Sequence, residues 1–216
     1  MDSSEIGERI AYYAESFIGT PYDTDSLGAY VTNKVIIYDS AIDCMYHVFR
    51  SVELAMADSY NSPVELALEK RFLTHGILDN LGRVVNYDER FQYAEDMIYS
   101  CKWGVNITGQ LSVSTIKIKG DRGIDNVEII EREKIPKIID NLRSGDIIYF
   151  IKSVEKRVVG EIIGHLGIIK KEGGQAFLIH ASGKKNINVG GEVKKVSFVE
   201  YCAQMAFIGI NVTRFL

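Results

Sequence analysis

Residues 164–183, GHLGIIKKEGGQAFLIHASG, contain two apolar runs of six residues, each with a histidine at its outer end. Four residues, 171–174, separate the runs, and a four-residue loop with glycines commonly joins antiparallel strands. The register that follows from this loop sets His165 directly opposite His180. Directly opposed side chains share one face of a sheet, with Cβ atoms about 4.5–5.5 Å apart. The stretch therefore predicts a hairpin in which one imidazole can orient the other.

A plainer interpretation is that each histidine is a separately satisfied part of its own strand. A register slip of one residue would place the two rings on opposite faces of the sheet. The choice between a structural hairpin and half of an active site therefore depends on whether the chain supplies a nucleophile elsewhere.

The pattern around the hairpin indicates an α+β fold. Further strands are predicted at 111–119, 146–152, 192–196 and 205–213, with a short helix at 136–142. Helical patterns occupy the first half of the chain, and helices followed by an antiparallel sheet are typical of the α+β class. The predicted helices span 5–17, 44–58, 63–75 and a segment from 88 to 104.

The candidate nucleophile is Cys44. Asp43 is a favourable N-cap, so Cys44 falls in the first helical turn. Unpaired backbone N–H groups and the helix dipole favour a thiolate there, whereas the carboxylate of Asp43 opposes it unless its charge is spent on capping. The alternative is that Cys44 is a small buried hydrophobe, which fits Cys101 and Cys202 better.

The other two histidines have simpler explanations. His47 follows Cys44 by three residues and shares its helix face, so it could be the base itself or form a metal-ligand pair with Cys44. No further cysteine or histidine pair completes a metal set with the usual spacing, and we expect no metal or cofactor. His75 precedes Gly76 and is interpreted as a helix C-terminal residue.

Composition sets limits on the function. The chain has 216 residues and a net charge of −4, so we expect no attraction to nucleic acid. The lysines late in the chain, including Lys184 and Lys185, are interpreted as solvated edges and turns. An odd number of cysteines, three, excludes a simple disulfide framework. No segment is apolar enough to span a membrane.

Several motifs resemble the NlpC-type cysteine peptidases, which share a papain-like core. IGTPY (18–22) is similar to the segment ahead of the cysteine, and IDCMYHVFRSVELA (42–55) to the nucleophile helix. SGDIIYF (144–150), GHLGII and LIHAS are similar to the strands that carry the base and the third residue. VVNYDERFQYAEDMI (84–98) most resembles the branch of N-acetylmuramoyl-L-alanine amidase-like proteins.

The resemblance implies a single domain over residues 1–216, with a helical insertion at about 61–110. In this fold an N-terminal helix bundle carrying Cys44 packs on an antiparallel sheet carrying His165 and His180. Cys44 matches the nucleophile, His165 the general base and His180 the orienting residue of a Cys-His-His triad. There are departures, because Met-Tyr follows the cysteine where most members have Ser-Gly, and a glycine precedes His165 where serine is usual.

The resemblance also implies the substrate-binding groups. Tyr22 matches a tyrosine that holds the oxyanion beside Asp43 and Cys44, although packing explains Tyr22 equally well. A stem peptide carries carboxylates, so an arginine is expected in the cleft. Arg90 is our choice and Arg83 the alternative, and either could be a solvated surface residue. Three aromatic residues could line the cleft or pack the insertion, namely Tyr87, Tyr93 and Trp103.

We therefore predict a hydrolase acting on the peptide part of bacterial peptidoglycan. The bond is either D-γ-glutamyl-diamino acid or N-acetylmuramoyl-L-alanine. The alternatives are a thiol acyltransferase on the same fold, favoured by a deep apolar groove beside Cys44, and a catalytically inactive cell-wall-binding module. The resemblance implies export to the periplasm or cell envelope with a signal peptide absent from this chain, and a cytoplasmic protein is the alternative. The oligomeric state is left open.

Overall fold

The computed structural model describes residues 3–58, 61–112, 114–185 and 189–216, and an antiparallel sheet forms its centre. The strands follow the order β2-β3-β8-β4-β5-β6-β7, and the short β1 pairs with β8. The strand bounds are β1 Val105–Asn106, β2 Ile116–Lys119, β3 Asn126–Glu131, β4 Ile147–Ile151, β5 Ile163–Glu172, β6 Gln175–Lys184, β7 Val189–Ser197 and β8 Gly209–Arg214.

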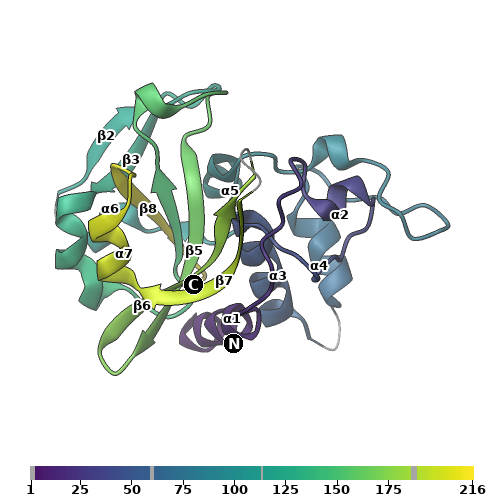
Figure 1. The fold of residues 1–216 in the computed structure, drawn as a ribbon, viewed down its shortest axis with the longest axis horizontal. Helices are drawn as coiled ribbons and strands as arrows, with labels where there is room; N and C mark the ends of the chain where they lie inside the picture. The colour runs from purple at the N-terminus through teal and green to yellow at the C-terminus, as the bar shows by residue number, and fades with distance from the viewer. Residues whose placement is uncertain (1–2, 59–60, 113, 186–188) are drawn as a thin grey trace.

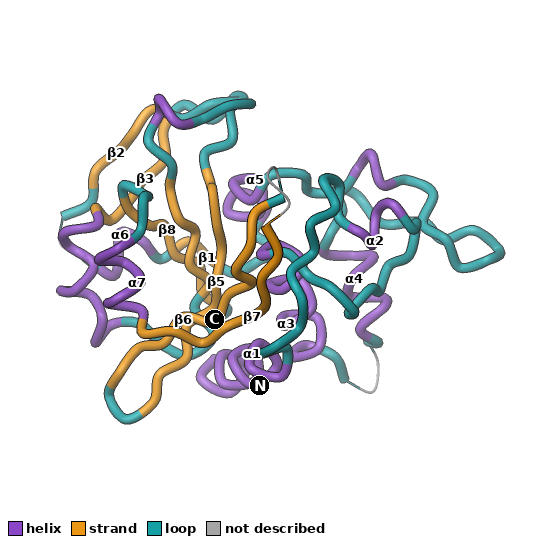
Figure 2. Tube along the Cα trace, viewed as in Figure 1, coloured by secondary structure: helices purple, strands orange, loops and turns teal. Residues whose placement is uncertain are grey.

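Helices cover both faces of the sheet (Figures 1 and 2). Helices α1 and α3 contact β5 and β6 on one face, whereas α6, α7 and η2 lie against the other. The helix bounds are α1 Ser3–Ser16, α2 Ala29–Thr32, α3 Cys44–Met56, α4 Pro63–Lys70, η1 Tyr87–Glu89, α5 Ala94–Ser100, α6 Thr108–Leu111, η2 Arg132–Asn141, η3 Val154–Lys156 and α7 Phe198–Gln204. The α+β prediction is confirmed.

The central strands are buried on both faces, and alternate residues enter different cores. In β4, Ile147 and Tyr149 join the core under α1 and α3, while Ile148 and Phe150 join the core under α7 and η2. This alternation follows from the two-residue period of a strand. It explains why β4 reads as a continuous apolar run. The same parity puts His165, which pairs with Phe150, on the α7 side.

Two helices are shorter in the structure than the sequence predicts. Helix α4 begins as expected, with a capping box at Ser62, but it ends at Lys70 and not near residue 75. The chain folds back there because the amide of Gly76 donates to the carbonyl of Leu68 (2.7 Å). The helix predicted from 88 to 104 is instead η1 followed by α5, because Arg90 between them is extended (φ −70°, ψ 158°).

Two strand predictions also need correction, and one strand was missed. The 111–119 segment is a strand only from Ile116, because Asn106 accepts hydrogen bonds from the backbone and hydroxyl of Thr108 and turns the chain into α6. The 205–213 segment is a strand only from Gly209 and follows α7, which Ser197 caps. Strand β3 was not predicted at all.

Described residues include no helix long and apolar enough to cross a membrane.

Candidate functional site

Cys44 is the first residue of α3, as the sequence predicts. The N-cap Asp43 is extended (φ −92°, ψ 179°), and its Oδ1 accepts a hydrogen bond from the backbone N–H of Tyr46 at 2.8 Å. The cap satisfies one of the free donors of the first turn. Cys44 is partly buried, and its side chain packs against the core under α1 and α3. The thiol therefore lies at the N-terminus of α3, against the core under α1 and α3.

The second oxygen of Asp43 has a partner that the sequence did not reveal. The Nζ of Lys185, one residue beyond β6, lies 2.7 Å from Asp43 Oδ2, and its side chain is only 21% exposed. The interpretation of Lys185 as a solvated edge residue is therefore wrong. A basic residue directly after the strand that carries His180 was the only available signal.

The Cys44 thiol is neutral at rest. Burial raises its pKa to about 12, and the carboxylate of Asp43 acts in the same direction. The backbone N–H of Leu166 and the ammonium of Lys185 oppose this rise but do not cancel it. Burial disfavours the charged form of any acid, and here it outweighs the helix terminus. The raised pKa opposes a resting thiolate, so we infer that ionisation accompanies attack.

His165 and His180 form a hydrogen-bonded pair. Nε2 of His165 lies 2.8 Å from Nδ1 of His180, and the two rings are nearly perpendicular (87°) with centroids 4.9 Å apart. The strands do not have the predicted register. The pair Glu172–Gln175 closes the hairpin around a two-residue Gly-Gly turn.

This turn explains why the predicted register of β5 and β6 was wrong and why His165 and His180 are nevertheless in contact. Both Gly173 and Gly174 have positive φ (54° and 79°), which is the type I′ geometry that matches strand twist. The true register is shifted by two residues, so His165 and His180 are diagonal and not directly opposite. A shift of two keeps both rings on the same face, and diagonal neighbours remain within reach of long side chains.

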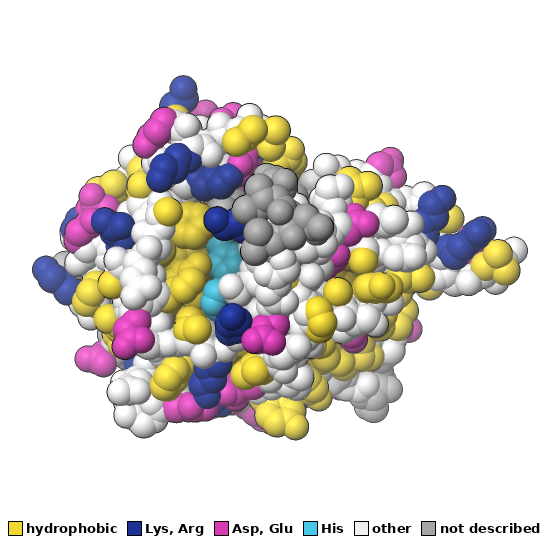
Figure 3. Space-filling view, in the orientation of Figure 1, with side chains coloured by type: hydrophobic (Ala, Val, Ile, Leu, Met, Phe, Trp, Pro, Cys, Tyr) yellow, Lys and Arg dark blue, Asp and Glu magenta, His cyan; other side chains and the backbone are white. Residues whose placement is uncertain are grey.

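An aromatic cluster surrounds the two imidazoles on the α7 face. Phe150 stacks on His165 with centroids 5.7 Å apart, and Tyr201 contacts His180 with centroids 5.0 Å apart. Burial lowers the pKa of His165 to about 3 and that of His180 to about 4. Both rings are neutral near pH 7. Histidine side chains are visible in a hollow of the surface in Figure 3, bordered by hydrophobic side chains.

The cysteine and the histidine pair meet through Leu166. This residue follows His165, and its backbone N–H faces the sulfur of Cys44. Tyr201, which packs on the imidazoles, also interacts electrostatically with Cys44. Across the part of the chain that the structure describes, no direct hydrogen bond joins the thiol to His165. Catalytic hydrogen bonds are often long in unliganded enzymes and shorten when substrate binds.

A cavity of about 260 Å³ opens beside the thiol. It brings Cys44 together with Tyr22, Asp43 and Arg90, the remaining residues of the predicted site, and with Lys185. Arg90 enters the cavity wall because its backbone bridges to Phe72 and its guanidinium donates to the carbonyl of Tyr87. The other lining residues are Ser26, Leu27, Tyr30, Met45, Phe91 and Gln92.

Tyr22 is positioned by a close approach to β6. A Cβ built on Gly183 would lie only 2.2 Å from the Tyr22 ring, so only glycine fits there. The amide of Tyr22 donates to the carbonyl of Gly191 (2.8 Å), and its backbone bridges to Ile42 just before Asp43. Burial, with Cys44 and Asp43 adding to it, raises the pKa of Tyr22 well above its ordinary value. Its hydroxyl therefore keeps its proton and can donate a hydrogen bond.

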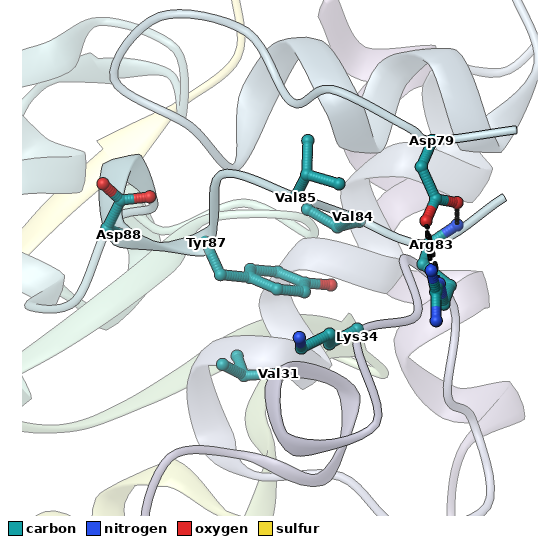
Figure 4. A pocket seen from close by; sticks show the side chains of 8 residues that line it. All are labelled: Val31, Lys34, Asp79, Arg83, Val84, Val85, Tyr87 and Asp88. Atoms are coloured by element: carbon teal, nitrogen blue, oxygen red, sulfur yellow. Dashed lines mark hydrogen bonds and ion pairs between the residues drawn. The ribbon is translucent and has the colours of Figure 1, made fainter. Parts of the chain in front are cut away.

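A second cavity, of about 400 Å³, shares no lining residue with the cavity beside the thiol, and Figure 4 shows its side chains. Its lining includes Arg83, which is 56% exposed and paired with Asp79 at 2.8 Å. Tyr87 also borders this cavity, and its hydroxyl donates to the carbonyl of Val35. None of the predicted catalytic residues borders it. Arg83, the alternative to Arg90, therefore does not line the cavity beside Cys44.

Other singled-out residues have structural roles. His47 is fully buried, with Nε2 at 3.2 Å from the carbonyl of Ala14, and burial lowers its pKa to about 4. Cys202 is buried in the α7 core, and Cys101 is an exposed helix C-cap with positive φ. Trp103 packs on Phe49, and Tyr93 lies under the guanidinium of Arg122. His75 lies beyond α4 and is exposed.

A buried charge network fixes α3 behind the thiol. Glu53 of α3 is fully buried and binds Arg71 through both oxygens (2.6 and 2.7 Å), and Oε2 also accepts from Arg50 (3.0 Å). Arg50 makes two further bonds to Asp39, which also accepts from the Tyr46 hydroxyl. The network ties α3 to the end of α4 and to the segment before the cap.

Within the described ranges, no group of three or more histidine, cysteine, aspartate or glutamate side chains is arranged to hold a metal ion.

Solved structures of several bacterial proteins have the same fold. An N-acetylmuramoyl-L-alanine amidase from Bacteroides uniformis matches with a TM-score of 0.72 and 18% identity, over 97% of this chain and 98% of that chain. A Legionella pneumophila protein of the family DUF1460 matches with a TM-score of 0.73 and 18% identity, over 98% and 89%.

A Bacteroides fragilis protein described provisionally as a xylanase also matches, with a TM-score of 0.70 and 18% identity over 95% of this chain and 100% of that chain. No family model matches the sequence, and no curated protein matches it. The chain therefore has an amidase-like α+β fold, and at these identities the likeness shows the fold alone.

Proposed function

We propose that the chain is a cysteine hydrolase that cleaves an amide bond in the peptide part of bacterial peptidoglycan. The observation that carries this proposal is the 2.8 Å hydrogen bond between His165 and His180, beside a cysteine that opens a helix. The amidase-like fold over almost the whole chain supports it. We also propose that the chain is one NlpC-type, papain-like domain over 1–216 with a helical insertion at about 61–110.

The proposed mechanism requires one arrangement of the protons on the imidazole pair. If His180 Nδ1 accepts the proton of His165 Nε2–H, then Nδ1 of His165 is left as a base for the Cys44 thiol. In attack, the sulfur bonds to the amide carbonyl carbon while the thiol proton moves to His165. His165 then protonates the leaving amine as the C–N bond breaks. Water, deprotonated by His165, releases the acyl group and restores the thiol.

Two donors stabilise the oxyanion in this mechanism. The backbone N–H of Cys44 belongs to the first turn of α3, where the amides lack helical partners. The protonated hydroxyl of Tyr22 lines the same cavity. Donors aimed at developing negative charge are often the largest contribution to catalysis. Tyr22 acts here as a catalytic residue and not only as packing.

The lining of the cavity favours a peptide over a lipid. Side chains that can bind a peptide include Arg90, for a carboxylate, and the polar groups of Ser26, Tyr30 and Gln92. A long acyl chain would need a deep apolar groove, whereas this cavity is only about 260 Å³ and mixes apolar residues with charged and polar ones. We therefore favour the hydrolase over the acyltransferase alternative. Because the proposed substrate is peptidoglycan, we also propose that the protein acts in the cell envelope.

The test is mass spectrometry of purified muropeptides after incubation with wild-type protein or with Cys44→Ser. The wild type alone is expected to release a fragment, and the mass of that fragment names the bond, D-γ-glutamyl-diamino acid or N-acetylmuramoyl-L-alanine. Release by both proteins would exclude Cys44 as nucleophile. Unchanged muropeptides, with folded wild-type protein, would reject the proposed substrate.

A further inference from the structure

Lys185 differs from the lysines around it. Its ammonium is paired with Asp43 at 2.7 Å, with side chains 21% and 13% exposed, and both residues line the cavity that contains Cys44. The adjacent Lys184 is exposed at the end of β6. The contact therefore joins the end of the strand that carries His180 to the cap of the helix that carries the nucleophile.

The contact has an electrostatic consequence for the thiol. A carboxylate next to a thiol opposes ionisation, because two negative charges would then share a partly buried site. Both oxygens of Asp43 are partnered: Oδ1 accepts from the Tyr46 amide, and Oδ2 binds Lys185. Without the ammonium, the carboxylate would keep its cap but lose its counterion. The thiolate would then form against an uncompensated negative charge.

We propose that Lys185 is a positioning residue for the proposed reaction: its ammonium neutralises the Asp43 carboxylate and thereby allows the Cys44 thiol to ionise during attack. This inference rests on the proposed function for its role in turnover. Its effect on the thiol does not depend on any substrate. The lysine acts through Asp43 and through its own positive charge near the sulfur.

The other titratable groups of the site do not supply this compensation. Tyr22 and Tyr201 are phenols whose raised pKa values keep them neutral, and the two imidazoles are neutral as well. Arg90 is a cation of the same cavity, but its guanidinium donates a hydrogen bond to the carbonyl of Tyr87. The carboxylate of Asp23 is buried and accepts hydrogen bonds from the backbone amides of Asp25 and Ala29. Asp43 and Lys185 are the charged side chains that shift the pKa of the thiol most.

The experiment measures the rate of iodoacetamide alkylation of Cys44 between pH 7 and pH 10, with peptide mapping to separate it from Cys101 and Cys202. Because only the thiolate reacts, each unit of thiol pKa changes the rate about tenfold below that pKa. Lys185→Gln is expected to slow alkylation about tenfold. Lys184→Gln is the matched control and should react as the wild type does, and Lys185→Arg should restore the rate.

A second variant keeps the test independent of folding. Asn caps a helix about as well as Asp, so Asp43→Asn removes the charge and keeps the cap. It is expected to speed alkylation about tenfold, and adding Lys185→Gln to it should slow the reaction less than in the wild type. Equal rates for Lys185→Gln and Lys184→Gln, or for Asp43→Asn and the wild type, would overturn the inference.

The same measurement separates the two proposals. Wild-type protein that leaves muropeptides intact, together with slowed alkylation in Lys185→Gln, would reject the substrate and keep the role of Lys185. Muropeptide cleavage at equal kcat in Lys185→Gln and Lys184→Gln, with equal alkylation, would keep the proposed function and reject the role of Lys185.

Discussion

Burial of His47 predicts how the stability of the protein depends on pH. His47 lies in α3 with Cys44, but its side chain is fully buried. Its Nε2 lies 3.2 Å from the carbonyl of Ala14, and among the described residues its Nδ1 is buried without a partner. Protonation would place a charge and an unpaired N–H in the core under α1. Burial therefore lowers the pKa of His47 from 6.5 to about 4.

The sign and size of the effect follow from linkage. The unfolded chain binds a proton at His47 below pH 6.5, whereas the folded protein does not until about pH 4, so stability is lost as pH falls through this window. Between pH 7 and pH 5 this one group removes about 2 kcal/mol from the free energy of unfolding. His165 and His180 act in the same direction, because their pKa values are lowered as well.

His47→Gln isolates the contribution of His47. Glutamine can donate to the Ala14 carbonyl but does not titrate. Urea unfolding followed by circular dichroism, at pH 7 and pH 5, is expected to show that the wild type loses about 2 kcal/mol more than His47→Gln. The contributions of His165 and His180 cancel in this comparison. An equal loss in both proteins would refute the buried, neutral assignment and reopen His47 as a base.

Three further predictions concern the scaffold and the site. Glu53→Gln should lower the free energy of unfolding by about 3–5 kcal/mol, because it leaves the buried Arg71 without its carboxylate partner, whereas Asp79→Asn at an exposed pair should leave the urea midpoint unchanged. Gly183→Ala should reduce muropeptide turnover by forcing the neighbouring tyrosine ring away, and Gly190→Ala, where a Cβ meets open space, should not; equal turnover would contradict this. His180→Phe should lower kcat roughly 10²-fold or more, whereas His180→Asn, which keeps an acceptor, should retain most of it; equal losses would exclude the orienting role.

The sequence predicted the elements of the site better than their connections. Cys44 at a capped helix start and the two histidines on one face of a hairpin follow from local rules, because capping and strand alternation depend on near neighbours. The register did not follow, because the Gly173-Gly174 turn closes with two residues and not four. The shift was an even number, and this alone preserved the shared face.

The parts that sequence reasoning missed depend on distant partners. Strand β3 pairs with β2, just before it in the chain, and with β8, near the C-terminus. Its own alternation of apolar and polar residues is weak. Lys185 resembled any surface lysine, because its partner Asp43 is distant in the chain. The raised pKa of the Cys44 thiol could not be predicted from the helix terminus, because burial of the thiol depends on residues far along the sequence, such as Leu166.

The central claim is that Cys44 forms a covalent acyl-enzyme. The most direct measurement is intact-protein mass spectrometry of an acid-quenched reaction with muropeptides, followed by peptide mapping. The account predicts an added mass equal to the acyl part of the substrate, carried by the Cys44 peptide and absent from His165→Ala. Product release with no adduct at any time, or an adduct on Cys101 or Cys202 instead, would contradict it.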